Sequence, residues 1–209
     1  MKLVLASNNV KKLAELQALL GGLALHLVAQ GALGIAEADE PHITFVENAL
    51  AKARHAAAAS GLPAMADDSG LCVDALGGAP GVISAHFAAV PTVEGDREMW
   101  RRAQDAANNQ KLLQQLHGVL DRRAAFVTTL VAVRHAQDPE PLLAFGRWTG
   151  VMLDAPRGNR GFGYDPLMFI PALGRTVAEL DAAEKNAVSH RALAAAQITQ
   201  LLREAWHLA

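Results

Sequence analysis

The sequence predicts an α/β fold in which helices flank a long mixed sheet. Two observations carry this prediction. In residues 1–74, apolar runs of strand length alternate with helical periodicity, which is typical of strand–helix units with parallel strands. Farther along, two long β-type segments at 124–135 and 142–153 flank the polar stretch Gln137–Glu140, which is typical of an antiparallel hairpin. A sheet that contains both must be mixed.

Length and composition bound the class of protein. The chain has 209 residues, which suits one domain over residues 1–209 or two small lobes that share one sheet. Hydrophobic residues make up 51% and charged residues 19%, close to an ordinary soluble protein. Because the net charge is −2, we expect no sequence-independent binding to nucleic acid, whereas a few local cations can still hold a small anion.

The cysteine content and the apolar segments bear on the compartment. Cys72 is the only cysteine, so no disulfide forms within the chain, and the cytoplasm is the simplest location. The apolar run Leu3–Ala6 is too short for a signal peptide. Residues 18–36 contain His26, Gln30 and four glycines, so they predict a helix end, a strand and a turn rather than a membrane span.

The N-terminal third predicts two strands and two helices. The expected strands are 2–6 and 23–29, and the expected helices are 10–20 and 44–60. The first helix ends at Gly21–Gly22. The second is expected to begin at Thr44, because Glu47 three residues later completes a capping box.

The rest of the chain adds the hairpin and two further helices. The expected elements are a short strand at 63–66, a turn at Ser69–Gly70, a possible strand at 71–74, a helix at 96–117, a glycine-rich loop at 158–163, a strand at 167–170 and a final helix at 189–207. No internal repeat interrupts this order.

The first candidate site is the polar loop before the first helix. Ser7, Asn8 and Asn9 precede that helix, and Lys11 and Lys12 lie in its first turn. A helix N-terminus presents N–H groups and partial positive charge, so such a loop favours phosphate. The alternative is an ordinary capped helix with solvated lysines.

The second candidate is the acidic pair Asp67–Asp68 after an apolar strand. Charged groups there are costly unless they bind something or cap the backbone. Mg²⁺ prefers carboxylate oxygens, and one carboxylate can also activate water, so the pair predicts a catalytic metal site. The alternative is a turn whose aspartates cap the backbone. Asp39 and Glu40, in an acidic loop beyond a strand, are candidate second ligands.

Two later segments complete the set. The glycines of the loop 158–163 let the backbone approach a flat ligand closely. Phe162 and Tyr164 can stack on a base. The alternative is a loop whose aromatic side chains are buried plugs, that is, side chains that fill the interior. Ser189 can cap the final helix, which places His190 and Arg191 in its first turn, where cations are normally disfavoured. An anionic or carbonyl-bearing partner explains that placement. Arg191 can donate to a purine O6, and Lys185 can reach a phosphate.

Together these segments resemble the inosine triphosphate pyrophosphatase family, the bacterial dITP/XTP pyrophosphatases. The resemblance covers nearly the whole chain in the family's order. Its motifs are Leu5–Lys12, Thr44–Ala49, Ala66–Leu71, Leu76–Gly81, Gly161–Pro166, Glu184–Asn186 and Ser189–Arg191.

The resemblance implies a fold and a reaction. The fold is a single domain over residues 1–209, a long mixed central sheet with flanking helices and two lobes around a nucleotide-binding cleft. The reaction is Mg²⁺-dependent hydrolysis of ITP, dITP and XTP to the monophosphate and pyrophosphate, which removes aberrant purine nucleotides from the pool. Homodimers are implied, and neither nucleic acid nor membrane is an expected partner.

Residue roles follow from matching positions. Asp68 becomes the catalytic carboxylate and a metal ligand, Glu40 the second acidic ligand, and Asp39 the alternative to it. Ser7 to Lys12 hold the triphosphate, and Phe162 to Asp165 hold the base and sugar. The substrate-binding set is Ser7, Asn8, Asn9, Val10, Lys11, Lys12, Ser69, Phe162, Gly163, Tyr164, Asp165, Lys185, His190 and Arg191.

One departure and two rival functions remain. Lys11 stands where the family commonly has glycine, which can alter a backbone contact to phosphate. The nearest rival is a related hydrolase that acts on modified pyrimidine nucleotides. The second is a non-catalytic nucleotide-binding or RNA-binding module, against which Asp67–Asp68 argues, because carboxylates repel phosphate unless a metal intervenes.

Overall fold

The fold is a mixed sheet with flanking helices, as the sequence predicts. The computed structural model describes residues 1–89 and 97–208. Over these residues the sheet has seven strands in the order β2-β1-β3-β4-β5-β6-β7. They are β1 (Lys2–Leu5), β2 (His26–Ala29), β3 (Ala64–Val73), β4 (Arg123–Val133), β5 (Leu142–Met152), β6 (Met168–Ile170) and β7 (Arg175–Thr176). β1 pairs parallel with β2 and β3, whereas β6 pairs antiparallel with β5 and β7.

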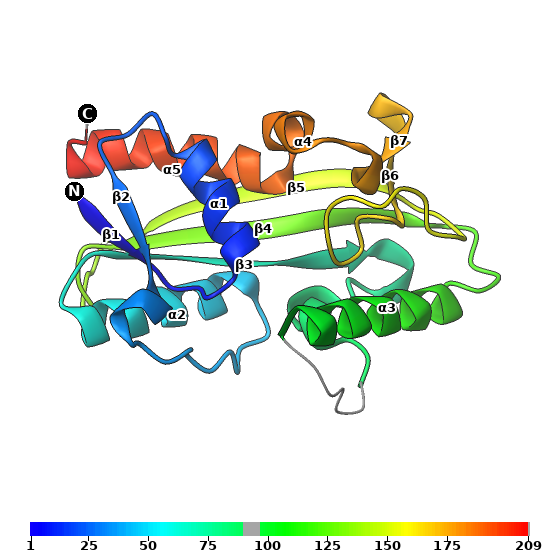
Figure 1. Cartoon of the computed structure of the whole chain (residues 1–209), viewed down its shortest axis with the longest axis horizontal. Coiled ribbons are helices and arrows are strands. Elements are labelled where there is room, and N and C mark those ends of the chain that lie inside the picture. Colours follow the sequence, from blue (N-terminus) through cyan, green and yellow to red (C-terminus); the bar gives the residue numbers. More distant parts are fainter. Residues whose placement is uncertain (90–96, 209) are drawn as a thin grey trace. The chain divides into compact units, whose positions relative to one another are not determined.

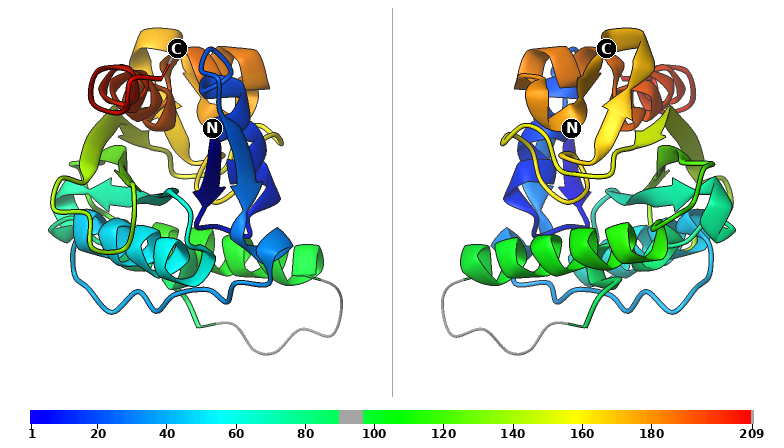
Figure 2. Two further views of the ribbon diagram at one scale, coloured as in Figure 1. Left: turned by 90° about the vertical axis from the view of Figure 1, so that its left-hand side faces the viewer. Right: turned by 90° about the vertical axis from the view of Figure 1, so that its right-hand side faces the viewer.

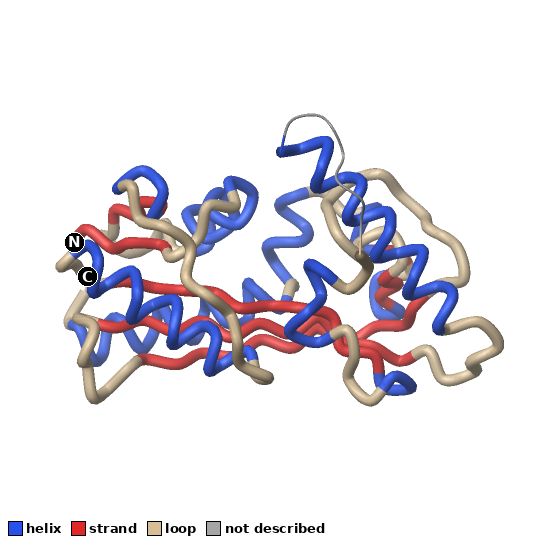
Figure 3. The backbone as a smooth tube through the Cα atoms, turned by 90° about the horizontal axis from the view of Figure 1, so that it is seen from below, coloured by secondary structure: helices blue, strands red, loops and turns tan. Residues whose placement is uncertain are grey.

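The chain divides into two compact units. The first comprises Met1–Asp68, Thr128–Arg147 and Val188–Ala209, and the second comprises Ser69–Val127 and Trp148–Ala187. The three longest strands, β3, β4 and β5, have residues in both units. Figure 3 shows the long strands as continuous segments. Within the described residues, no helix is both long and apolar enough to cross a membrane.

The first unit covers the two faces of its strands with different helices. Its helices are α1 (Val10–Leu19), α2 (Phe45–Ser60), α5 (His190–Trp206) and the 3-10 helix η1 (Gln30–Leu33). Within this unit α1 and α5 lie on one side of the strands and α2 on the other (Figure 1), and both views of Figure 2 keep α5 (red) and α2 (cyan) apart in this way.

Alternation along the strands builds the two cores of the first unit. Leu3, Leu5 and Met65 join the cluster that packs on α1 and α5. Val4 and Ala66 join the cluster that packs on the alanines of α2. Successive side chains of a strand point to opposite faces, so each strand contributes to both layers.

The second unit has its own core. It contains α3 (Arg97–Gln115), α4 (Ala182–Val188) and the 3-10 helices η2 (Asp74–Leu76), η3 (Gly81–His86), η4 (Pro171–Leu173) and η5 (Val177–Glu179). Its apolar cluster includes Leu112, Phe126, Trp148 and Tyr164. Asp96, the expected first residue of the helix at 96–117, lies outside the described residues.

The predicted turn at Ser69–Gly70 is wrong. β3 runs unbroken from Ala64 to Val73, so Asp67 and Asp68 lie inside a strand. Leu71 and Val73 are fully buried, and the Leu71 N–H donates to Ser84 Oγ at 2.9 Å. Burial and pairing of the second half of the strand therefore override the turn preference of a Ser-Gly dipeptide.

Capping motifs and periodicity in the sequence predict some element boundaries correctly and miss others. Thr44 caps α2 as predicted by accepting from Glu47 N–H at 3.4 Å, but the Glu47 carboxylate returns to the Thr44 hydroxyl instead of completing a capping box. A full capping box lies at Thr176 and Glu179, where none was predicted. α4 and β7 were also missed, because elements of 7 and 2 residues are too short to show periodicity.

The cysteine and two of the tryptophans lie in packed positions. Cys72 is half-buried in β3. Trp148 belongs to the core of the second unit, and Trp206 packs against the α1–α5 core of the first. The Trp100 ring lies 6.2 Å from the His86 ring.

Candidate functional site

The polar loop Ser7–Asn9 turns β1 into α1. Ser7 Oγ accepts from the Asn9 N–H at 3.2 Å, and Asn9 Oδ1 accepts from the N–H groups of Lys11 and Lys12 at 3.0 and 3.3 Å. Asn8 Nδ2 donates to Glu37 Oε1 at 3.0 Å. Asn9 is therefore a helix cap, as in the plainer of the two sequence interpretations.

The two lysines after this loop differ. Lys11 is exposed, as is Val10, which precedes it. Lys12 is half-buried, and its Nζ lies 2.6 Å from Asp67 Oδ1. The expectation of two solvated lysines thus fails for Lys12, because the strand places a carboxylate within its reach.

Asp67 is a fully paired buried carboxylate. Besides Lys12, its Oδ2 accepts from Arg191 Nε and from the Thr128 hydroxyl, both at 3.3 Å. Arg191 is itself 2% exposed and is also bonded to Glu15. Burial alone would raise the pKa of Asp67, but Lys12, Arg191 and Lys52 outweigh it and hold the pKa well below its usual range.

Asp68 has a different environment. Its Oδ1 accepts from Lys52 Nζ at 3.0 Å, and the same Nζ lies 3.1 Å from Glu40 Oε1. Its Oδ2 is buried and has no hydrogen-bond partner among the described residues. Burial raises the pKa of Asp68 to about 6, against the lowering effect of Lys52 and with a further contribution from Glu40.

Lys52 stays charged in this cluster. Its burial would lower its pKa, yet Asp68, Asp67 and Glu40 outweigh that effect and raise the pKa above its ordinary value. A buried ammonium thus lies between the carboxylates of Asp68 and Glu40.

The cluster around Asp68 fits a hard divalent cation. A buried carboxylate oxygen without a partner, next to a second carboxylate on Glu40, is the kind of donor that Mg²⁺ takes together with water and phosphate oxygens. Among the described residues, no group of three His, Cys, Asp or Glu side chains could hold a metal by itself. Asp39 is exposed, and Glu40 is the member of the acidic loop that reaches the cluster.

The glycine-rich loop of the second unit is held by its own side chains. Asp165 Oδ2 accepts from the Phe162 N–H at 3.0 Å and from Lys185 Nζ at 2.8 Å. Lys185 Nζ also lies 4.7 Å from the centroid of the Phe162 ring. Gly161 has φ +75°, and a Cβ there would lie 2.0 Å from Asp165 Oδ2, so only glycine fits.

The two aromatic residues of this loop have separate surroundings. Tyr164 is buried, and its hydroxyl donates to the Ser84 carbonyl at 2.9 Å. Burial, helped by Asp105, raises the pKa of Tyr164. The buried-plug interpretation therefore describes Tyr164, whereas Phe162 is half-buried. Ser69 is half-buried in β3.

The start of α5 places His190 and Arg191. Ser189 is the N-cap, as predicted, and its Oγ accepts from the Ala192 N–H at 3.1 Å. Gly146 of β5 makes this placement possible, because a Cβ there would lie 1.7 Å from the His190 carbonyl oxygen. His190 and Arg191 are both buried, and the carboxylates of Asp67 and Glu15 explain a cation at this helix N-terminus.

Comparison with known proteins gives the family. Residues 3–201 match the Ham1 family. The chain belongs to the Ham1 family. A relative from Methylibium petroleiphilum named dITP/XTP pyrophosphatase is 68% identical over 206 residues, which cover 99% of each chain. A relative of the same name from Leptothrix cholodnii is 66% identical over 212 residues, which cover 100% of each chain.

Solved structures of Ham1 proteins share the fold. A HAM1 protein from Coxiella burnetii is 43% identical, with a TM-score of 0.87 and coverage of 98% of this chain and 99% of that one. A nucleoside-triphosphatase / dITP/XTP pyrophosphatase from Mycobacterium abscessus is 38% identical, with a TM-score of 0.70 and coverage of 98% of both chains.

Several residues of this Ham1 chain join the candidate site without having been predicted. Lys52, Thr128 and Glu15 contact the two aspartates or their partners. Lys52 offered a signal, since it lies on the alanine-rich face of α2 with Ala49, Ala53 and Ala56, where a solvated lysine is out of place. Thr128 offered none, because threonine is ordinary in a strand.

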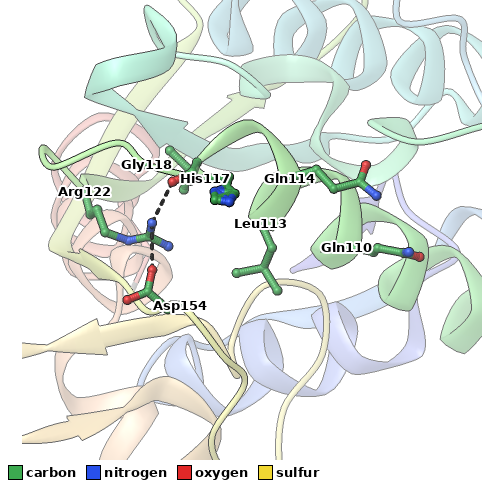
Figure 4. A pocket seen from close by; sticks show the side chains of 8 residues that line it. Gln110, Leu113, Gln114, His117, Gly118, Arg122 and Asp154 are labelled. Carbon is green, nitrogen blue, oxygen red and sulfur yellow. Dashed lines mark hydrogen bonds and ion pairs between the residues drawn. The ribbon is translucent and has the colours of Figure 1, made fainter.

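A surface hollow of about 610 Å³ in the second unit has a different lining. Its walls are α3 residues such as Gln110 and Gln114, together with His117, Arg122 and Asp154. Arg122 is bonded to Asp154 and to the Leu116 carbonyl, so its charge is already satisfied (Figure 4). None of the predicted site residues is among its described lining residues.

Proposed function

We propose that this Ham1 protein hydrolyses the aberrant purine nucleotides ITP, dITP and XTP to the monophosphate and pyrophosphate with Mg²⁺. The observation that carries the proposal is Asp68, a buried carboxylate with one oxygen lacking a partner among the described residues and a pKa of about 6. The names of the relatives at 68% and 66% identity support the substrate class.

Asp68 is suited to act as the general base. Its Oδ2 is buried and has no hydrogen-bond partner among the described residues, so this oxygen can accept the proton of a water beside it. In the proposed step, a water oxygen forms a bond to the α-phosphorus, and the bond from that phosphorus to the α–β bridging oxygen breaks. The proton of the water goes to Asp68, and pyrophosphate leaves.

Asp68 and Glu40 are the residues that would hold Mg²⁺. When bound, the ion would neutralise the triphosphate and strengthen the electrophilic character of the α-phosphorus. The fit rests on the partnerless Asp68 Oδ2 and on the nearness of Glu40 to the shared Lys52. Asp39 stays the alternative acidic ligand of the same loop.

The cations of the first unit are the proposed triphosphate contacts. Lys52 already lies against Asp68 and Glu40, and Lys12 lies in the first turn of α1, directly after the loop Ser7–Asn9. Each lysine supplies a point charge with three donors, which suits the oxygens of a phosphate chain. Lys11 and Val10, both exposed beside this loop, belong to the proposed set.

The base and its edge are assigned to other residues. Phe162 is the proposed stacking platform, with Gly163, Asp165 and Lys185 around it. Arg191 is proposed to recognise the purine O6, and adenine, with an amino group at that position, would leave such a donor unpaired at a cost of about 1–3 kcal/mol. His190 and Ser69 complete the proposed contacts, and Tyr164 supports the loop from the core.

The assembly and the location are part of the same proposal. We expect a homodimer in the cytoplasm, with neither nucleic acid nor membrane as a partner. The net charge of −2 supports the absence of nucleic acid as a partner, and the lone Cys72 supports the location.

The test is a substrate profile. Purified protein is incubated with ITP, XTP, GTP, ATP and a modified pyrimidine nucleoside triphosphate, with and without Mg²⁺, and pyrophosphate and monophosphate are quantified, with Asp68→Asn as the control. Fast metal-dependent release from ITP and XTP, slow release from GTP and ATP and an inactive control are expected. Orthophosphate as the product, equal turnover of all four nucleotides or an active control would contradict the proposal, and preference for modified pyrimidine nucleotides would favour the rival hydrolase.

A further inference from the structure

Two side chains of α3 hold the peptide backbone of Gly163 from both ends. Asp105 Oδ2 accepts from the Gly163 N–H at 2.9 Å, and Asn109 Nδ2 donates to the Gly163 carbonyl at 2.9 Å. The two residues are four apart on the helix, so they lie on one face of α3 one turn from each other. One supplies the acceptor and the other the donor that a single residue's backbone requires.

This backbone lies at the centre of the glycine-rich loop. Gly163 separates Phe162 from Tyr164 and has φ +61°, a left-handed conformation that the flanking backbone must keep. Tyr164 is anchored in the core through Ser84, and Asp165 binds the Phe162 N–H. The Asp165 N–H also donates to the Phe162 carbonyl at 3.2 Å. The two hydrogen bonds from α3, here called the clamp, add to these constraints by fixing the backbone of the next residue, Gly163.

We propose that Asp105 and Asn109 are positioning residues that hold the Phe162 ring in the orientation that stacks on the nucleotide base. The inference rests on the proposed function. It adds that α3, a helix far from the loop in sequence, fixes the position of the ring that stacks on the base. Both residues belong to the second unit, as does Phe162, whereas Asp68, Lys12 and Lys52 belong to the first. Loss of the clamp should therefore weaken substrate binding more than the chemical step.

The same helix provides a matched control. Asn108, next to Asn109, uses its side chain to bind the Ser84 and Ala85 carbonyls at 3.2 and 3.1 Å and the Ala88 N–H at 2.8 Å. It is 2% exposed, so its loss removes at least as many buried hydrogen bonds as the loss of Asn109. Its partners belong to η3 and the residues after it. The Ser84 carbonyl also accepts from the Tyr164 hydroxyl, and this bond to the loop remains in Asn108→Ala.

The variants separate positioning from folding. We expect Asn109→Ala and Asp105→Ala to raise the KM for ITP about tenfold, the effect of one or two lost hydrogen bonds, with kcat within about twofold of the wild type. Asp105→Asn keeps an acceptor oxygen and should restore most of the affinity. Asn108→Ala should lower the melting temperature and leave the KM unchanged.

A second readout does not need turnover. Hydrogen exchange of the peptide 158–166 in the free protein should become faster in Asp105→Ala and in Asn109→Ala, and should stay at the wild-type rate in Asn108→Ala. If Asn109→Ala fails to fold, the comparison of Asp105→Ala with Asp105→Asn carries the test.

The outcomes distinguish this inference from the function on which it rests. Active wild-type protein with an unchanged KM in both alanine variants would overturn the positioning role alone, and so would an equal rise in KM for Asn108→Ala. Wild-type protein that fails to release pyrophosphate from ITP would overturn the proposed function and the base assignment with it.

Discussion

Asp67 and Asp68 are neighbours in β3, yet their surroundings shift their pKa values in opposite directions. Asp67 continues the face of Met65, towards α1 and α5, and meets Lys12, Arg191 and Thr128. Asp68 continues the face of Ala64 and Ala66, towards α2, and meets Lys52. The alternation of a strand sends two adjacent carboxyls into two different layers.

The two carboxyls differ in whether both of their oxygens have hydrogen-bond or ion-pair partners. The cations around Asp67 lower its pKa, so it stays a fixed anion that orders Lys12 and Arg191. Burial raises the pKa of Asp68 to about 6 and leaves its Oδ2 without a partner among the described residues. One carboxyl is thus suited to holding structure, and the other to binding an ion and moving a proton.

The largest expected effect is on turnover. Asp68→Asn should lower the kcat for ITP by about two to four orders of magnitude, because the amide cannot accept the proton of the attacking water. Pyrophosphate release measured at saturating ITP and Mg²⁺ checks this. Asp67→Asn should lower the free energy of unfolding and should leave kcat much nearer to the wild-type value than Asp68→Asn does. An Asp67→Asn protein that is stable and inactive would show that the roles of the two residues are reversed.

Arg191 should matter to folding as well as to base recognition. Arg191→Ala removes a buried partner of Asp67 and Glu15 and should lower the free energy of unfolding by about 3–5 kcal/mol, the usual effect of breaking a buried ion pair. Urea denaturation measures it. Arg203→Ala is the matched control, since Arg203 is an exposed arginine of the same helix. A loss equal to that of the control would mean that the Asp67 network does not stabilise the fold.

The two aspartates should also give opposite pH dependences of stability. The folded pKa of Asp67 lies below the value of 3.8 for a free side chain, so its stabilisation is present above about pH 4 and is lost as the pH falls further. Asp67→Asn should therefore be less stable than wild type at pH 7, with a difference that shrinks below pH 4.

For Asp68 the sign is reversed. Its folded pKa of about 6 lies above the value of 3.8 for a free side chain, so ionisation destabilises the fold above pH 6, and this cost fades as the pH falls towards 3.8. Asp68→Asn should be more stable than wild type at pH 8 and nearly equal at pH 4. Thermal melts with a chelator present check both variants, and a stabilised Asp67→Asn at pH 8 would contradict the comparison.

The smallest expected effect concerns Thr128. Its hydroxyl is fully buried and bonds Asp67 Oδ2 and the Asp68 carbonyl, both at 3.3 Å. Thr128→Val keeps the shape of the side chain and should lower the free energy of unfolding by about 1 kcal/mol, with little change in kcat. A large loss of kcat would show instead that the hydroxyl orients Asp68 through its backbone.

Much of this molecule could be predicted from local patterns. The long periodic segments, the Ser189 cap of α5 and the mixed sheet follow from spacing and capping chemistry that involve only neighbouring residues. The failures have two causes. The Ser69–Gly70 turn fails because burial decides the conformation there, and α4 was missed because a helix of 7 residues is too short to show periodicity.

The sequence by itself determined which chemical groups are present: the acidic pair, the loop before α1, the glycine-rich loop and the basic residues at the start of α5. Only the tertiary structure decided which of them meet. Lys12 and Arg191 reach Asp67 from helices at 55 and 124 residues' separation, and Lys52 reaches Asp68 from α2. The reason is physical, since burial and pairing set the pKa of a carboxyl, and both depend on contacts that no local pattern contains.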